Sequence, residues 1–547
     1  MRFIITGMAG SIQAVDARLL GDSVGENSVN QRPRLGELTP WRQAAQVAAV
    51  PFDRRTIYRM GRDVLSDTAY WMSWTTVVHV VRGFYASDST ERTYFTGSGA
   101  PKVTDNVIGL AAPPYPTAAR ELGVPAPDGS SLLTVAAVGS GDERLVFYAD
   151  TFITDKGEES KPRIIGSLTA RPSSTVSIAN LPAVPAGNYG ITTRRIYRSE
   201  VGTSGQSDFF FLKDIPSTDP GTLDEGLAVG AGTLATTGWE MPPADLKCLI
   251  GLWSGMLAGI SGRSVRFCES YKGYAWPVAY EFIPADVTPV GLAVWSGNLL
   301  VLTTGRPYIL SGSLPGSMSD QSIPFEKGCV SERSICNVEH GVVWASPDGL
   351  AYYGDLGARL LTDGILTRDQ WLALNPETLV GVLYEGLYLG SYEVQPGGAR
   401  RCFAINTREP AGIYYAEQGF TCAFLDKLRD SVFILDGGSI KKWDAGQAFT
   451  TATFRSKVFR SAQEVTISAG ELIARRFPAT VRAYCSAVDE ATGEVIFELR
   501  DERVVTDGEA FTLDGGSPGK EWQFEIATAG TVIGANFAPS LRDLRAD

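Results

Sequence analysis

Histidine is almost absent from this sequence: His79 and His340 are the two examples in 547 residues. Most nucleophilic triads and many zinc sites need an imidazole within reach of its partners, and neither an HExxH motif nor an H-x-E with PCxxC signature is present. His79 lies inside the apolar segment VVHVV and His340 lies beside the turn VEHGVV, so we interpret both as structural residues. This shortage argues against catalysis, and we predict a protein that is not an enzyme.

Motifs that cradle nucleotides or present a serine nucleophile are missing as well. There is no GxxxxGK[ST] loop and no GxSxG turn, and GSGAPK at 97–102 lacks the last glycine of GxGxxG. SPDGLAYY at 346–353 lacks the S-x-D-x-G-x-T-W box of sialidase-type blades. The 61 acidic residues leave one alternative open, a pair of carboxylates that cleaves sugars. We predict no catalytic, cofactor-binding or metal-binding residues, with a propeller glycosidase as an alternative.

Cysteine is scarce, and its spacing forms no recognisable motif. The seven cysteines include no CxxC pair, which excludes a zinc ribbon or a dithiol redox motif. We expect buried free thiols in a protein made in a reducing cytosol. No run of 18 apolar residues occurs, and the first 20 residues lack a signal-peptide core, so neither a spanning helix nor a secretion signal is expected.

Lysine is missing from the first 63 residues, which contain nine arginines and six acidic residues although the whole chain has a net charge of −12. The acidic balance argues against a protein that binds DNA through its phosphates. Arginine without lysine suits bidentate contacts in a packed interface. We predict a partner interface at Arg32, Arg34, Trp41 and Arg42; a solvated surface of chance composition is the alternative.

The 59 glycines and 30 prolines are spread along the chain, which is typical of short strands joined by turns and predicts an all-β protein. Residues 1–125 are predicted to form an N-terminal arm with one short helix before Pro51, then the first strands, within 69–84 and 89–106. The proline-rich passage at 111–129 marks a boundary. Residues 126–240 are predicted to form a fibronectin type III-like β-sandwich.

Residues 241–452 contain five apolar units split by Ser-Gly, Asp-Gly or Gly-Gly turns, at the spacing of propeller blades. We predict a β-propeller-like body, with a stacked sandwich as the alternative. One helix is expected at 366–376, where Thr367 and Gln370 can form a capping box. The strand-rich segment 453–547 is predicted either to close the propeller or to form a further sandwich.

Several long segments resemble virion structural proteins of short-tailed bacteriophages, of the tail nozzle or tail hub type. They are PPADLKCLIGLWSGMLAGISGRSVRFCESYKGYAWPVAYEF (242–282), GLAVWSGNLLVLTTGRPYILSGSLPGSMS (291–319), CVSERSICNVEHGVVWASPDGLAYY (329–353), LTRDQWLALNP (366–376), STERTYFTGSGAPKVTDN (89–106) and FRSKVF (454–459). The resemblance covers about residues 80 to 460.

This resemblance implies a propeller-bearing subunit of a homo-oligomeric ring, a hexamer, that docks below the portal and adaptor proteins and contacts tail fibres or spikes. DNA would pass through its lumen during ejection without specific binding. The protein would be made in the host bacterial cytoplasm and end in the virion tail. A receptor- or glycan-binding tail module is the alternative, motivated by the aromatic residues and the sandwich at 126–240.

Overall fold

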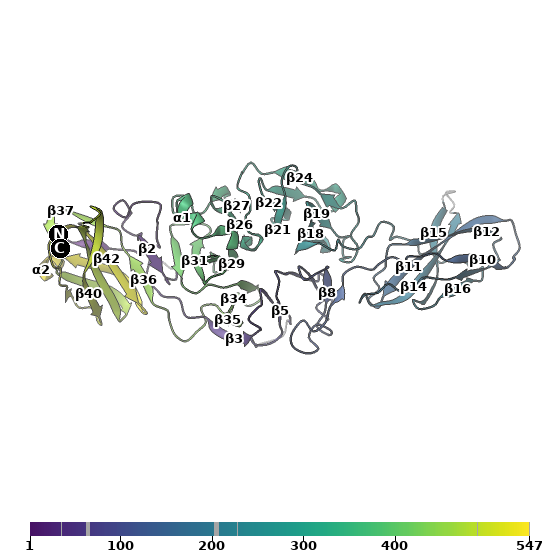
Figure 1. Ribbon diagram of the computed structural model, residues 1–547, viewed down its shortest axis with the longest axis horizontal. Helices are drawn as coiled ribbons and strands as arrows, with labels where there is room; N and C mark the ends of the chain where they lie inside the picture. Colours follow the sequence, from purple (N-terminus) through teal and green to yellow (C-terminus); the bar gives the residue numbers. More distant parts are fainter. Residues whose placement is uncertain (34–35, 62–65, 202–206, 227, 490, 546–547) are drawn as a thin grey trace.

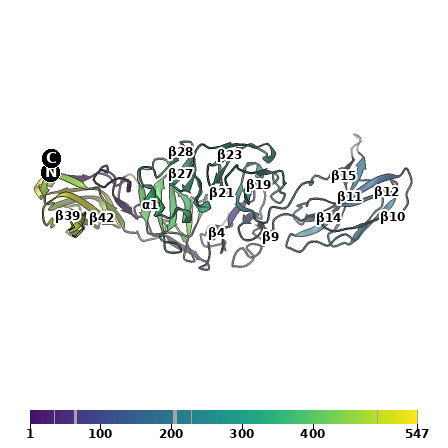
Figure 2. The same cartoon turned by 45° about the horizontal axis from the view of Figure 1, so that its top comes forward.

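The computed structural model is an elongated, almost entirely β-stranded molecule with three parts in a row (Figure 1). A sandwich that holds both termini lies at one end, a ring of small sheets lies in the middle, and a second sandwich lies at the other end. Figure 2 shows the same order from another side. The all-β prediction is confirmed. The structure describes residues 1–33, 36–61, 66–201, 207–226, 228–489 and 491–545.

The middle part contains six antiparallel units of four strands within the described ranges, each built from strands that are mostly consecutive in the chain. We call each unit a blade. The first two blades are β6 (His79–Arg82), β7 (Thr93–Thr96), β8 (Lys102–Thr104) and β9 (Arg120–Glu121), then β17 (Lys247–Gly251), β18 (Leu257–Ser261), β19 (Ser264–Phe267) and β20 (Glu281–Phe282).

The next two blades are β21 (Pro289–Trp295), β22 (Asn298–Thr303), β23 (Tyr308–Ser311) and β24 (Ser319–Ser322), then β25 (Cys336–Val338), β26 (Gly341–Ser346), β27 (Gly349–Gly354) and β28 (Gly357–Leu360). The last two are β29 (Val380–Tyr384), β30 (Leu387–Glu393), β31 (Arg400–Asn406) and β32 (Ile413–Ala416), then β33 (Cys422–Asp426), β34 (Ser431–Asp436), β35 (Ser439–Lys442) and β3 (Ala45–Ala49). A seventh, two-stranded blade consists of β4 (Thr56–Arg59) and β5 (Trp71–Trp74).

Seven hydrophobic clusters join these blades in a cycle. The β6–β9 blade packs on β17–β20, that blade on β21–β24, and so on through β25–β28, β29–β32 and β33–β35 to β4–β5. The β4–β5 blade then packs on β6–β9 through Met72, Trp74 and Phe95. This cyclic order makes a propeller-like ring rather than a stack of sheets, with the first strand of each blade innermost.

The predicted turns explain why these segments form hairpins. Ser296–Gly297, Glu385–Gly386 and Gly437–Gly438 all have positive φ angles at both positions and connect directly paired strands. Two residues with positive φ form the type I′ turn, whose twist matches that of antiparallel strands.

The N-terminal arm closes the ring. Residues 45–49 pair as β3 with β35, the outer position of the blade whose other strands come from residues 422–442. The short helix predicted before Pro51 is therefore wrong: AQVAA is helix-prone by composition, but the free edge of β35 supplies hydrogen-bond partners that favour a strand.

In its described residues, the inserted part is a sandwich of seven strands. One sheet has the order β10 (Leu132–Ala137), β13 (Thr175–Ala179), β16 (Gly221–Asp224), and the other has the order β12 (Arg163–Ala170), β11 (Arg144–Thr154), β14 (Ile191–Val201), β15 (Ser207–Pro216). Val146, Tyr148, Ile178 and Ile196 fill the core between them. The strand order establishes a sandwich, and its likeness to a fibronectin type III domain stays a prediction.

The C-terminal segment forms a further sandwich, one of the two predicted alternatives. Its first sheet contains β1 (Phe3–Ile5), β43 (Thr531–Ala538), β38 (Ala469–Arg476) and β41 (Phe511–Thr512), and its second contains β36 (Ala452–Arg455), β42 (Gly519–Thr528), β39 (Ala479–Val488), β40 (Val495–Val505) and β37 (Phe459–Val465). The arm strand β2 (Asn27–Val29) pairs with both β32 and β36, so one hydrogen-bonded sheet runs from the propeller into this sandwich.

Helices are short in the described chain: α1 (Arg368–Leu372) and α2 (Leu541–Leu544), with 3-10 turns η1 (Trp253–Gly255), η2 (Pro315–Ser317), η3 (Glu332–Ser334) and η4 (Pro376–Thr378). The helix predicted at 366–376 is confirmed, and Thr367 and Gln370 form the expected capping box. Among the described residues, we find no helix that is both long and apolar enough to cross a membrane.

Candidate functional site

Two of the four predicted interface residues hold the N-terminal arm against the ring. The Arg32 guanidinium lies 2.9 Å from Asp444 Oδ2 and 2.6 Å from Glu385 Oε2. It also lies 5.6 Å from the centre of the Trp41 ring. Trp41 is buried and packs edge-on against Trp443. Arg32 and Trp41 therefore act within the chain in this structure.

Arg42 is the predicted interface residue that stays open to solvent. Its backbone N–H donates to Asp444 Oδ1 at 2.7 Å, while its guanidinium lies 5.2 Å from the centre of the Phe449 ring. Arg34 lies outside the described residues. The structure thus brings Arg32, Trp41 and Arg42 together around Asp444, where burial raises the pKa of the carboxyl against the effect of Arg42 and Arg32.

The C-terminal sandwich ends in a long exposed edge strand. β40 pairs with β39 on one side and, within the described ranges, with no strand on the other. Four of its apolar side chains are exposed: Val495 51%, Ile496 38%, Leu499 50% and Val504 60%. A long apolar edge with free backbone groups is a surface onto which another chain can add. The sequence predicted this strand but not its position at the edge of a sheet. The available signal was that neither set of alternating side chains in VIFELRDERVV is consistently apolar.

The inserted sandwich combines a buried ionic core with exposed apolar residues. Arg194 and Asp150 are both fully buried and form an ion pair, and Arg163 donates to Asp150 Oδ1 at 2.9 Å. On the outer surface, Leu145 is 58% and Ile164 is 55% exposed. The ionic core fixes the sandwich internally, whereas the exposed residues are available for contact with a partner.

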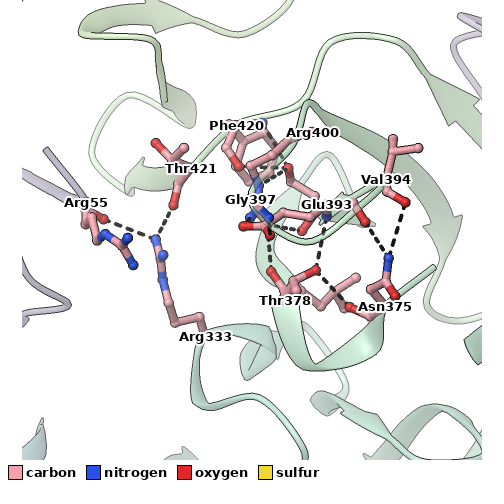
Figure 3. A network of polar contacts seen from close by, with 12 residues as sticks. Arg55, Arg333, Asn375, Thr378, Glu393, Val394, Gly397, Arg400, Phe420 and Thr421 are labelled. Atoms are coloured by element: carbon pink, nitrogen blue, oxygen red, sulfur yellow. Dashed lines mark hydrogen bonds and ion pairs between the residues drawn. The ribbon is translucent and has the colours of Figure 1, made fainter. Parts of the chain in front are cut away.

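A polar network lies where the inner strands of several blades begin (Figure 3). Arg333, before β25, donates to the carbonyls of Arg55 and Thr421, which precede β4 and β33. Arg400 donates to the carbonyl of Thr378 at 2.6 Å and to Glu393 Oε1 at 2.9 Å. Because β25 and β4 are three blades apart, Arg333 bridges the ring across its axis.

A cavity beside this network has a volume of about 750 Å³. Its lining mixes aromatic and polar side chains: Trp41, Phe52, Phe420, Trp443, Arg42, Arg400, Gln418, Asp436 and Lys441. The buried indole N–H of Trp443 has no hydrogen-bond acceptor among the residues that the structure describes. Such a lining suits a small polar ligand with an apolar face.

The thiols are placed as expected: all seven cysteines are buried and unpaired. Burial raises the pKa of Cys268, Cys329 and Cys336 to about 12, which makes them poor nucleophiles at neutral pH. His340 lies beside Glu339, with 3.7 Å between Nε2 and the carboxylate. His79 lies at the inner end of β6, near Cys248 and Glu332.

No family model and no curated protein matches this sequence. Solved structures that are similar include virginiamycin B lyase from Staphylococcus aureus, with 11% identity over 60% of this chain and 92% of that chain and a TM-score of 0.25. PorZ, a surface component of the type-IX secretion system of Porphyromonas gingivalis, is 10% identical over 87% of this chain and 77% of that chain, with a TM-score of 0.26. Similarity at this level does not bear on the activity of this chain.

Proposed function

We propose that this chain is a non-enzymatic structural subunit of the tail nozzle or hub of a short-tailed bacteriophage. In this role it forms a homo-oligomeric ring, a hexamer, below the portal and adaptor proteins and encloses part of the DNA ejection channel. It contacts tail fibres or spikes and resides in the virion tail after synthesis in the host bacterial cytoplasm. The resemblance of residues 80 to 460 to such proteins supports the proposal.

The observation that carries the proposal is the exposed apolar edge of β40. A soluble monomer with an 11-residue open edge and four exposed aliphatic side chains is prone to aggregate. In a ring, a different surface of the next subunit covers that edge, because head-to-tail packing uses two complementary patches on each copy. The edge is therefore the surface expected of a subunit that assembles.

The DNA channel in this proposal lies between subunits, at the centre of the oligomer. The axis of the propeller itself is crossed by Arg333, so it is not a passage for a duplex. A net charge of −12 disfavours persistent contacts with phosphate, which suits a conduit through which DNA slides. The fibronectin type III-like sandwich, at the far end of the molecule, is the part proposed to meet fibres or spikes.

Assembly of purified protein tests the proposal. The wild-type chain is expected to form rings in negative-stain images and a single oligomer in sedimentation velocity, with its order given by native mass spectrometry. The double variant Val495→Lys/Leu499→Lys is expected to remain monomeric with an unchanged circular dichroism spectrum. Leu428→Lys, a change at an even more exposed apolar residue of the propeller, is the control and should assemble normally. A wild-type chain that stays monomeric with adaptor rings present would contradict the proposal.

The cavity beside Trp443 favours a second candidate function, recognition of a glycan on the host surface. Aromatic walls can stack on a sugar ring, and the unpartnered indole N–H of Trp443 can donate to a hydroxyl. Binding to one glycan class on an array, lost in Trp443→Phe, would support this candidate. An array without signal would remove it.

A further inference from the structure

Three potential metal ligands from three different blades meet near the propeller axis. His79 begins β6, Cys248 lies in β17 and Glu332 lies in η3, directly before β25. One nitrogen, the sulfur and one carboxylate oxygen all lie within 4.8 Å of one another. Cys248 Sγ lies 3.2 Å from Glu332 Oε2. Sequence spacing gave no hint of this cluster, because the three residues are separated by the inserted sandwich and a whole blade.

The local backbone directs Cys248 and Glu332 toward each other. Cys248 has a φ of 52°, which is unusual for a residue other than glycine, and the pairing of β17 with β18 shifts register between Lys247 and Ile250. Glu332 is held in a tight turn, in which Ser334 N–H donates to the Ser331 carbonyl at 3.2 Å. Ser331 Oγ in turn donates to the Leu379 carbonyl at 2.8 Å.

A divalent cation matches the charges that these groups can supply. Cys248 Sγ lies beside Glu332 Oε2, and an ion that displaces the thiol proton to solvent would balance one thiolate and one carboxylate. Lys247 and Arg333 are cationic neighbours of His79, so the two anionic ligands must outweigh their repulsion of the ion.

We propose that His79, Cys248 and Glu332 form a binding site for a divalent transition metal, with zinc as its ion, that fastens three blades at the propeller axis. Imidazole nitrogen, thiolate sulfur and carboxylate oxygen are the donors that zinc takes in proteins, and three such ligands leave a fourth position for water. The Arg333 guanidinium donates to the Arg55 and Thr421 carbonyls, which leaves the Glu332 carboxylate available to a metal ion. The site is independent of the proposed tail function.

Metal content and cobalt spectroscopy of the full chain test this site. After dialysis against zinc and removal of free metal, elemental analysis is expected to find one zinc ion per chain. The Co²⁺-loaded chain is expected to show a thiolate-to-cobalt charge-transfer band and the intense visible bands of tetrahedral cobalt. Cys248→Ala and Glu332→Gln should each weaken zinc binding by at least about 10-fold in competition with a chromophoric chelator.

Matched controls use the other residues of the same types. Cys485 lies in the C-terminal sandwich, and His340 is the second histidine of the chain. The variants Cys485→Ser and His340→Gln should therefore bind zinc like the wild type. If Cys248→Ala does not fold, His79→Gln provides the same test at a partly exposed position. Absence of bound zinc, a cobalt spectrum without the thiolate band, or equal binding by Cys248→Ala and the wild type would overturn the site.

Discussion

Replacing Trp41 with alanine should release the N-terminal arm from the ring without unfolding the ring itself. Trp41 is 3% exposed, and its neighbours are Trp443, Tyr384 and the Arg32 guanidinium. Truncating a buried tryptophan to alanine costs about 3–5 kcal/mol. Because Trp41 packs the arm onto the blade that β3 completes, this cost should fall on the opening of β3.

Hydrogen exchange measures that opening directly. Within residues 43–50, β3 pairs with β35, and two flanking bonds run from Gln43 N–H to the Ala448 carbonyl and from Val50 N–H to the Gly438 carbonyl. A loss of about 3–5 kcal/mol lowers the protection of these amides about 150- to 4000-fold. Arg42→Ala, at an exposed residue, should change it by less than about threefold. Unchanged exchange in Trp41→Ala, combined with lost ring assembly, would refute this reasoning and make Trp41 a contact to a partner.

Three further changes test other parts of the structure. Asp150→Asn leaves Arg194 buried beside an uncharged amide and should destabilise the inserted sandwich by about 3–5 kcal/mol, measured by urea unfolding; a loss below about 1 kcal/mol would contradict the buried pair. Thr367→Ala removes the α1 capping box and should cost about 0.5–2 kcal/mol, and Thr367→Ser should restore most of it. Lys327 holds the pKa of Asp348 below its ordinary value of 3.8, so Asp348→Asn should cost about 0.2–1 kcal/mol above pH 4. That difference should vanish as the pH falls through the lowered pKa, and a difference that persists at the lowest pH would argue against the ion pair.

Local signals in the sequence predicted the elements that depend on local contacts. The capping box at Thr367 and the Gly-containing turns of the blades lie within a few residues of the elements they stabilise, so the sequence predicted these elements. It did not predict strand β3, because the alanines of β3 have little strand preference and its partner, β35, is distant in sequence. The blade formed by β6–β9 was predicted as strands but not counted among the five units, since its turns are less regular.

The candidate sites were harder to predict for the same reason. Arg32 was selected from composition, yet its partners Glu385 and Asp444 follow it by several hundred residues and could not be anticipated. His79 was interpreted as a structural residue because its neighbours in sequence are apolar. Its neighbours in space, Cys248 and Glu332, become visible only when the propeller brings three blades to one axis.

Closure by the N-terminal arm also determines when this chain can finish folding during its synthesis. The Arg42 backbone N–H bonds to Asp444, 402 residues later, and β1 pairs with β43, the last strand in chain order among the described residues. At ribosomal rates of about 5–20 residues per second, the arm waits on the order of tens of seconds before its partners emerge. During that time the strands of the arm have no partners in their own chain, so the ring and the sandwich can close only after synthesis of the segments that pair with them.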